Sequence, residues 1–172
     1  MVRGDDMRGG GADALGRRLC LFAVVAALVV AFDQAVKAWV RAALVPGEPV
    51  ALIPGVMDLS LVYNTGAAFS LGEGAGWLFV AIAVVISVGA VVFVVREKDA
   101  PLALVATLGC VAGGGIGNAI DRVAQGSVTD FFATTFVDFA VFNVADVFIT
   151  CGVVVAFLLW WRWDSRRGGD DD

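Results

Sequence analysis

The chain has 172 residues, of which 59% are hydrophobic and only 17% are charged, and its formal net charge is −5. Soluble domains carry about 25% charged residues, so this composition argues against an ordinary soluble domain. The chain contains no histidine, which excludes a Ser-His-Asp triad, a Cys-His pair and an HExxH zinc site. Hydrolytic chemistry would have to use carboxylates, lysine or serine, and we expect neither a metal ion nor a cofactor. No basic patch interleaved with aromatic residues lies outside the apolar stretches, so we expect no binding to nucleic acid.

Four apolar stretches are long enough to cross a bilayer as helices, namely residues 19–40, 77–95, 101–120 and 141–161. A bilayer core about 30 Å thick needs roughly 20 apolar residues in a helix. We therefore expect an α-helical membrane protein with four transmembrane helices in residues 19–161, between an N-terminal tail (1–18) and a C-terminal tail (162–172). A cleaved signal peptide is an alternative interpretation of the first stretch, but the stretch is long and no small-residue cleavage site follows it.

Basic residues predict the orientation of these helices. Arginines gather in both tails, and the short connection between the second and third stretches contains Arg96 and Lys98. The other two connections contain only Arg41 and Arg122, with Lys37 near the first. The positive-inside rule then places both termini in the cytoplasm and the two long connections outside. β-Prone segments in these connections, at 50–53, 57–63 and 127–132, are expected to pair into a small extracytoplasmic β-sheet.

Three of the four stretches carry ionisable or amide side chains, and all of these fall at the same, outer end of the predicted bundle. They are Asp33 and Lys37 in the first stretch, Asn118, Asp121 and Arg122 at the end of the third, and Asn143 and Asp146 early in the fourth. A charge inside hydrocarbon costs several kcal/mol, so such residues are functional candidates. Within each stretch their spacing of three or four residues places them on one helix face.

Asp130 lies in the second outer connection, and a loop that folds back over the fourth helix would bring it to Asp146. Two carboxylates that share a site keep one proton between them. This arrangement suits peptide hydrolysis, because the ionised acid takes a proton from water and the protonated acid polarises the scissile carbonyl. The acids and the substrate backbone could be held by Asn64, Asn118 and Asn143, and Arg122 could offset local negative charge or bind a lipid phosphate.

Each of these residues also has a simpler interpretation. Asp33 and Lys37 fit a structural ion pair that braces helix packing, and Asp121 fits a hydrogen-bonding role that orients the third helix or Arg122. Asp130 alone would be an ordinary loop acid, and the nearby Asp138 is an alternative candidate for its place. The glycines at 113–117 include a GxxxG spacing, which allows close approach of a neighbouring helix.

Five segments of the chain, in this order, closely resemble the motifs of the bacterial lipoprotein signal peptidase family. They are Asp33-Gln34-Ala35-Val36-Lys37, Asn64-Thr65-Gly66-Ala67-Ala68-Phe69-Ser70, Gly117-Asn118-Ala119-Ile120-Asp121-Arg122, Val128-Thr129-Asp130-Phe131 and Phe142-Asn143-Val144-Ala145-Asp146. Two departures are visible. Val147 stands where a small polar residue commonly follows the last motif, and the segment before Phe142 lacks the proline and aromatic pattern often found there. Both bear on the shape of the pocket, and neither removes a candidate catalytic group.

The resemblance implies an aspartic endopeptidase of the bacterial cytoplasmic membrane with its site on the extracytoplasmic side. Members remove the signal peptide of a prolipoprotein just before a cysteine that carries a diacylglyceryl group, and cyclic peptides such as globomycin inhibit them. The implied catalytic dyad falls on Asp130 and Asp146. The positions implied to line the pocket or support it are Asn64, Gly66, Asn118, Arg122 and Asn143, with Asp33, Lys37 and Asp121 as further support. Expected partners are prolipoproteins and membrane lipid, and nothing requires more than a monomer.

Two other classes of function remain open from the residues alone. A proton- or ion-coupled transporter could use Asp33, Asp121 and Asp146 as a relay, although relay acids usually lie near the midplane with polar access from both sides. A noncatalytic membrane subunit would use the glycines and the Asp33/Lys37 pair only for packing. Proton flux in liposomes without peptidase activity would favour the first, and unchanged function after Asp146→Ala would favour the second.

Overall fold

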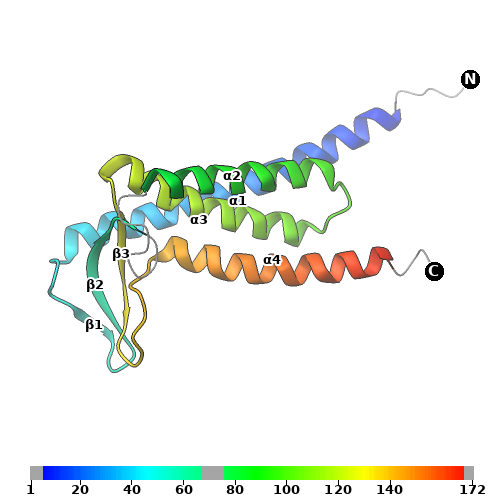
Figure 1. Ribbon diagram of the computed structural model, residues 1–172. Helices are drawn as coiled ribbons and strands as arrows, with labels where there is room; N and C mark the ends of the chain where they lie inside the picture. Colours follow the sequence, from blue (N-terminus) through cyan, green and yellow to red (C-terminus); the bar gives the residue numbers. More distant parts are fainter. Residues whose placement is uncertain (1–5, 67–75, 169–172) are drawn as a thin grey trace, which may run out of the picture.

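The computed structural model describes residues 6–66 and 76–168, which form a helix bundle with a small sheet at one end (Figure 1). The helices are α1 (Asp6–Ala43), α2 (Gly76–Arg96), α3 (Leu102–Gln125) and α4 (Val144–Gly168). The strands are β1 (Val50–Ile53), β2 (Met57–Asn64) and β3 (Val128–Thr134). Within the described residues each of the four helices is long and apolar enough to cross a membrane. The predicted fold class, four such helices with a small sheet, is therefore confirmed.

The helix bounds differ from the predicted stretches most clearly in α1, α3 and α4. α1 begins at Asp6, so the helix extends into the residues predicted as the N-terminal tail, and α3 continues past residue 120 to Gln125. α4 begins at Val144 and runs to Gly168, whereas the apolar stretch covers 141–161. Hydropathy shows where a run of apolar side chains begins and ends. The ends of a helix are instead determined by backbone hydrogen bonding. Asn143 consequently precedes α4, and its predicted place on a helix face was wrong.

α3 lies at the centre of the bundle, and its glycines let the neighbouring helices pack at backbone distance. A Cβ added at Gly113 would lie 2.7 Å from the carbonyl oxygen of Ala26 in α1. A Cβ added at Gly114 would lie 2.6 Å from the carbonyl oxygen of Ala145 in α4. Real Cβ atoms do not approach so closely, so only glycine permits these contacts. The expected close helix approach at 113–117 is confirmed, and it involves α1 on one side of α3 and α4 on another.

The three strands form an antiparallel sheet in the order β1-β2-β3, at the end of the bundle away from both termini (Figure 1). A turn at Gly55, whose φ of 75° favours glycine, joins β1 to β2. Leu61 of β2 and Phe131 of β3 are buried in one cluster with Val40 of α1 and Val144 of α4. This cluster fixes the sheet on the bundle, and it holds β3 beside the first turn of α4.

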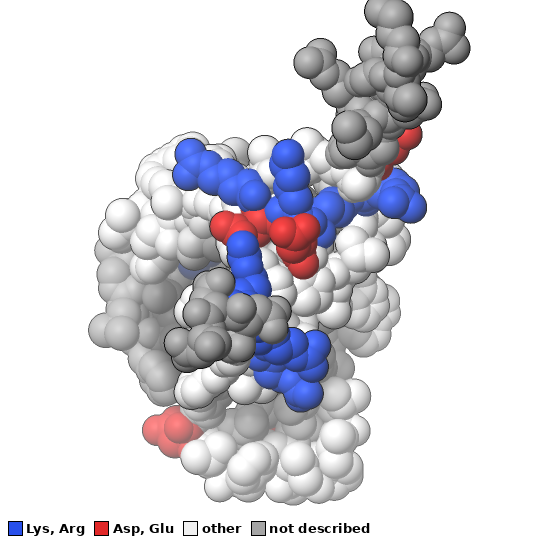
Figure 2. Space-filling view, turned by 90° about the vertical axis from the view of Figure 1, so that its right-hand side faces the viewer, with Lys and Arg blue, Asp and Glu red and all other residues white. Residues whose placement is uncertain are grey.

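The opposite end of the bundle carries both termini and the connection between α2 and α3 (Figure 1), and Figure 2 shows many Lys and Arg side chains there. Arg18 of α1 is buried and donates to the carbonyl oxygens of Ala100 and Glu97 at 2.7 and 2.8 Å. Arg167 of α4 pairs with the Glu97 carboxylate at 2.9 Å. Arg18 therefore stabilises the α2–α3 connection, a role that its predicted place in a tail did not suggest.

Candidate active site

A cavity of about 470 Å³ lies where the sheet meets the ends of α3 and α4. Its polar wall consists of Asn64 on β2, Asn118 and Arg122 on α3, Asp130 on β3 and Asp146 on α4. The remaining lining is mostly apolar and comprises Val128, Phe139, Ala140, Val141, Phe142, Val147, Thr150 and Cys151. The fold thus brings the two acids predicted to meet, Asp130 and Asp146, into one partly open cavity. Asp138, the alternative acid, is exposed and does not line it.

Asp146 and Asn143 together form a capping box at the start of α4. The Asn143 side-chain oxygen accepts from the backbone N–H of Asp146 at 3.1 Å, and an Asp146 carboxylate oxygen accepts from the backbone N–H of Asn143 at 3.0 Å. Each side chain satisfies a donor that the helix itself leaves free. The box places Asp146 in the first helical turn, where the helix dipole favours a negative charge. The three-residue spacing that suggested a shared helix face therefore reflects helix capping.

Asp130 is held by two asparagines within the sheet end of the cavity. β3 pairs with β2 so that Asp130 lies opposite Val62, and its side chain accepts from Asn64 at 3.0 Å and from Asn143 at 2.6 Å. Only 3% of the residue is exposed. Burial raises the pKa of Asp130 to about 6, and the nearby Asp146 charge adds to this, against the lowering effect of the asparagine donors. A carboxyl with this pKa keeps its proton up to about pH 6, well above the range of an ordinary aspartate.

The two acids are joined by a chain of amide hydrogen bonds through α3. Asn118 donates to Asp146 at 2.8 Å, and its own oxygen accepts from Asn143 at 3.1 Å. Asn143 uses the same amide nitrogen to donate to Asp130. Both asparagines are buried, at 8% and 0% exposure; the bonds of Asn143 to Asn118 and Asp130 are buried, and that of Asn118 to Asp146 is partly buried. The arrangement fixes each carboxyl in position on the cavity wall.

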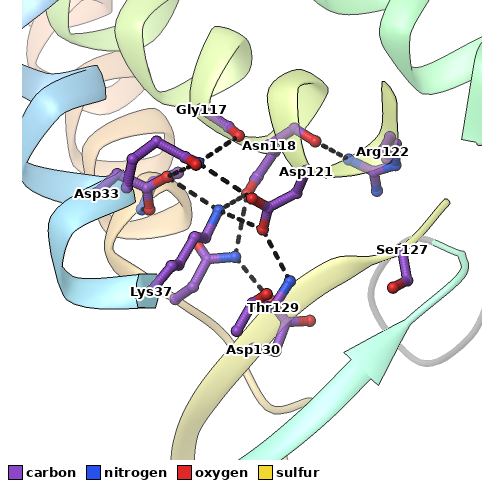
Figure 3. A network of polar contacts seen from close by, with 12 residues as sticks. Asp33, Lys37, Gly117, Asn118, Asp121, Arg122, Ser127, Thr129 and Asp130 are labelled. Atoms are coloured by element: carbon purple, nitrogen blue, oxygen red, sulfur yellow. Dashed lines mark hydrogen bonds and ion pairs between the residues drawn. The ribbon is translucent and has the colours of Figure 1, made fainter. Parts of the chain in front are cut away.

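Behind this cavity lies a buried ion cluster formed by α1 and α3 (Figure 3). Lys37 pairs with Asp33 at 2.9 Å and with Asp121 at 3.3 Å, and neither Lys37 nor Asp33 has exposed side-chain surface. Asp33 also accepts from the backbone N–H of Ala145 at 3.0 Å, which ties α1 to the first turn of α4. None of the three charged residues lines the cavity. The simpler interpretation of Asp33 and Lys37 as a structural ion pair therefore agrees with the geometry.

Asp121 connects the end of α3 to the sheet. It accepts from the backbone N–H of Thr129 at 2.9 Å and from Gln34 at 3.1 Å, and it lies 3.8 Å from Arg41. Of the two roles predicted for Asp121, these contacts fit the one that orients the third helix. They do not include a contact with Arg122. By holding Thr129, Asp121 also fixes the strand position that precedes Asp130.

Arg122 joins α3 to α2 and to the segment after β2. It donates to the carbonyl oxygen of Gly66 at 2.8 Å and to that of Asn118 at 3.4 Å, and its guanidinium lies 4.9 Å from the centre of the Phe79 ring. Gly66 in turn donates its N–H to Asn64 at 2.9 Å. Arg122 and Asn64 line the cavity, whereas Gly66 holds both of them through its backbone hydrogen bonds. Residues 67–70 of the same motif lie outside the described residues.

Sequence reasoning assigned no role to some residues of this network. Gln34 donates to the carbonyl oxygen of Gly117 at 3.1 Å as well as to Asp121. The buried Thr129 hydroxyl accepts from Arg41 and from Gln125, each at 2.9 Å. Gln34 is a polar residue inside an apolar stretch, and this was the feature of the sequence that could have indicated its role. The contacts of Thr129 depend on the strand register, which the sequence does not reveal.

Comparison with known proteins identifies the family. The model of the family "Signal peptidase (SPase) II" matches residues 25–162, which is most of the chain. The chain belongs to the signal peptidase II family. Its residues 25–162 therefore include every element that forms the cavity described above.

Individual members of the signal peptidase II family support this conclusion. A lipoprotein signal peptidase of Streptococcus thermophilus is 38% identical over 146 residues, which are 85% of this chain and 95% of that protein. The lipoprotein signal peptidase of Streptococcus pneumoniae is 35% identical over 142 residues, with 83% and 93% covered. The chain is thus a peptidase by family, and the predicted resemblance is confirmed.

Two solved structures share the fold of this signal peptidase II chain. A bacterial membrane enzyme determined by the in meso method at 2.3 Å is 29% identical, with a TM-score of 0.77 over 84% of this chain and 90% of that chain. A second, at 1.9 Å, is 30% identical, with a TM-score of 0.72 over 80% and 90%. Together with the four helices long enough to span a bilayer, they show a multi-pass membrane protein.

Proposed function

We propose that this protein is an intramembrane aspartic endopeptidase that removes the signal peptide of diacylglyceryl-modified prolipoproteins, cutting just before the lipidated cysteine. Family membership supports the substrate class. The observation that carries the mechanism is the pair of acids, Asp130 and Asp146, on the wall of one cavity and joined by buried asparagines. The site lies on the extracytoplasmic side of the bacterial inner membrane, because the basic residues gather at the opposite end of the bundle.

The structure supports different protonation states for the two acids. Asp146 accepts from Asn118 and from the backbone N–H of Asn143 at the N-terminus of α4, so both of its carboxyl oxygens face hydrogen-bond donors of the protein. Asp130 is more deeply buried, and its pKa is raised to about 6. Asp146 is therefore assigned as the base and Asp130 as the acid, although the pair titrates as a coupled unit.

The reaction then follows from this assignment. Asp146 takes a proton from a water molecule, and the water oxygen attacks the scissile carbonyl carbon, while Asp130 gives its proton to the carbonyl oxygen. In the second step Asp146 gives its new proton to the leaving amide nitrogen, and the C–N bond breaks as Asp130 recovers its proton from the tetrahedral hydroxyl. Asn64 and Asn143 hold Asp130 throughout, and Arg122 supplies positive charge at the cavity wall.

The apolar part of the cavity fits a substrate that comes from the membrane. Phe139, Val141, Phe142 and Val147 line it beside the polar wall, so one side suits lipid and apolar side chains and the other suits a peptide backbone. A peptide-like inhibitor of the globomycin type would occupy the same space.

One copy of the chain supplies both acids, so we propose a monomer as the active unit. The transporter hypothesis is less well supported, because Asp33 and Asp121 are both paired with Lys37 away from the cavity.

Cleavage of a purified precursor tests this function. The purified protein is expected to shorten a diacylglyceryl-modified precursor on a gel and to leave the unlipidated precursor intact, with globomycin blocking the reaction. The lipidated product should begin at the modified cysteine by mass spectrometry. Cleavage of both precursors at equal rates would contradict the lipid requirement, and cleavage at another bond would contradict the proposed position.

The pH dependence of kcat/KM tests the assignment of Asp130 as the acid. Because the protonated form is required, activity is expected to fall as pH rises above about 6, the pKa of Asp130. The hydrogen bond from Asn64 lowers this pKa, so Asn64→Ala should move the alkaline limb to higher pH. The raised pKa of Asp130 also affects folding stability. The contribution of Asp130 to stability is fully present below about pH 3.8 and is lost as the pH rises through about 6. A limb that moves to lower pH in Asn64→Ala would contradict the assignment.

A further inference from the structure

Lys37 makes a contact that its role as a counter-ion does not require. Besides the two carboxylates, its ammonium donates to the side-chain oxygen of Asn118 at 2.8 Å. An ammonium has three donors and no acceptor, and here each donor has one acceptor: Asp33, Asp121 and Asn118. Lys37 is fully buried and does not line the cavity. It therefore touches the catalytic wall only through Asn118 (Figure 3).

The contact with Lys37 determines which way the Asn118 amide points. The atom that faces an ammonium must be the amide oxygen, because two donors repel one another. The amide nitrogen of Asn118 is then left to face Asp146, to which it donates at 2.8 Å. Asn143 is fixed in the same manner by the backbone N–H of Asp146, so its amide nitrogen faces Asn118 and Asp130. Two groups that can only donate, the Lys37 ammonium on α1 and the backbone N–H of Asp146 on α4, thus set the direction of every hydrogen bond in this series of amides.

We propose that Lys37 is a positioning residue for the proposed dyad, which locks the Asn118 amide so that it donates to Asp146 and holds that carboxyl in place as the base. The inference rests on the proposed function, since it concerns how the same site is prepared. In the absence of Lys37, only the 3.1 Å bond from Asn143 would hold the Asn118 oxygen. The amide could then turn, and Asp146 would lose the donor that holds its carboxyl.

Charged groups lie on every element packed around the dyad, so the test must separate their effect from that of the Asn118 amide. They are Asp33, Lys37 and Arg41 on α1, Asp121 and Arg122 on α3, and Asp130 on β3. Removing the Lys37 cation alone would raise the pKa of Asp130, which the Lys37 charge lowers. A variant that restores the local charge balance but not the contact of Lys37 with the Asn118 oxygen separates the effect of charge from the effect of the amide orientation.

The decisive variant is Asp33→Asn combined with Lys37→Met. The pair removes one negative and one positive charge, and the asparagine oxygen can still accept from the backbone N–H of Ala145. Lys37→Met alone leaves Asp33 and Asp121 without their buried cation and is expected to lower thermal stability. The double variant should recover most of that stability. Its kcat should nevertheless stay reduced by on the order of 10²-fold with little change in KM, and the acid limb of its pH profile should lie at higher pH.

Two further variants complete the experiment. Arg41→Met removes a cation that contacts Asp121 and Thr129 but not Asn118, so kcat and the acid limb should stay near those of the unmodified protein. Asn118→Asp keeps an acceptor for Lys37 but removes the donor to Asp146, so it should lose kcat as the double variant does. Recovery of kcat and of the normal acid limb in the double variant, or full kcat in Asn118→Asp, would overturn the positioning role. Failure of the unmodified protein to cleave the lipidated precursor would instead overturn the proposed function.

Discussion

Replacing either Asp130 or Asp146 with asparagine is expected to abolish cleavage of a lipidated precursor while the protein still inserts into the membrane. Each acid carries a proton in both steps of the proposed reaction, and loss of a positioned acid or base costs about 10²–10⁴-fold in rate. Asparagine has nearly the same shape as aspartate but cannot take a proton. The measurement is the single-turnover rate on the purified precursor, with membrane yield and thermal stability recorded for each variant.

Asp138→Asn is the matched control for this pair. Asp138 lies eight residues beyond Asp130 on the same connection, but it is exposed and does not line the cavity. The control should cleave at the rate of the unmodified protein. Full turnover by Asp130→Asn or by Asp146→Asn would remove that acid from the mechanism. Equal loss in Asp138→Asn would show that the connection, rather than the carboxyl, matters.

The asparagine at Asp146 should also disturb the amide chain, which gives a second readout. An amide nitrogen at this position would face the Asn118 nitrogen or the backbone N–H of Asn143, both of which are donors. Asp130→Asn meets a similar conflict, because the backbone N–H groups of Gly66 and Asp146 hold Asn64 and Asn143 with their amide nitrogens toward residue 130. Both variants are therefore expected to be less stable than the Asp138→Asn control.

The gathering of the polar residues of the spans, Asp146 among them, at one end of the bundle was predictable because membrane burial makes a charge costly, whereas Asp130 alone read as an ordinary loop acid. The up-and-down order of four spans puts the ends of the first and third and the start of the fourth at one end, and the structure gathers their polar residues there. The β-prone alternation at 57–63 and 127–132 likewise predicted the pairing of β2 with β3. These inferences need only the period of the pattern and the cost of burying charge.

The direction of each hydrogen bond was not predictable from the sequence. Asn143 and Asp146 have a spacing that fits both a helix face and a capping box, and only the start of α4 at Val144 decides for the box. The bond from Thr129 to Asp121 depends on the placement of β3, which the packing of Phe131 against Val40 helps to set. Such contacts follow from tertiary packing, so a pattern of residue types in the chain does not contain them.

The packing of α3 against α4 leads to a second large effect, expected for Gly114→Ala. The added methyl group would lie 2.6 Å from the carbonyl oxygen of Ala145 and 2.8 Å from a side-chain carbon of Ile149. The first of these atoms belongs to the backbone of a helix, so it cannot move aside as a flexible side chain would. The two helices must separate, and overpacking of this kind costs about 1–3 kcal/mol.

The activity of Gly114→Ala is expected to fall as well, by on the order of 10²-fold, because Asp146 follows Ala145 directly and moves with it away from Asn118. Gly115→Ala is the control on the same helix, where the added methyl would lie 3.5 Å from the Ala83 side chain, an ordinary contact. Alanine in a helix interior is favoured over glycine by roughly 0.5–1 kcal/mol, so this variant should be at least as stable as the unmodified protein and equally active. Thermal unfolding in detergent and the precursor cleavage rate measure both outcomes. A Gly114→Ala protein with unchanged stability and rate would show that α4 tolerates a shift, and that the position of Asp146 does not depend on this glycine contact.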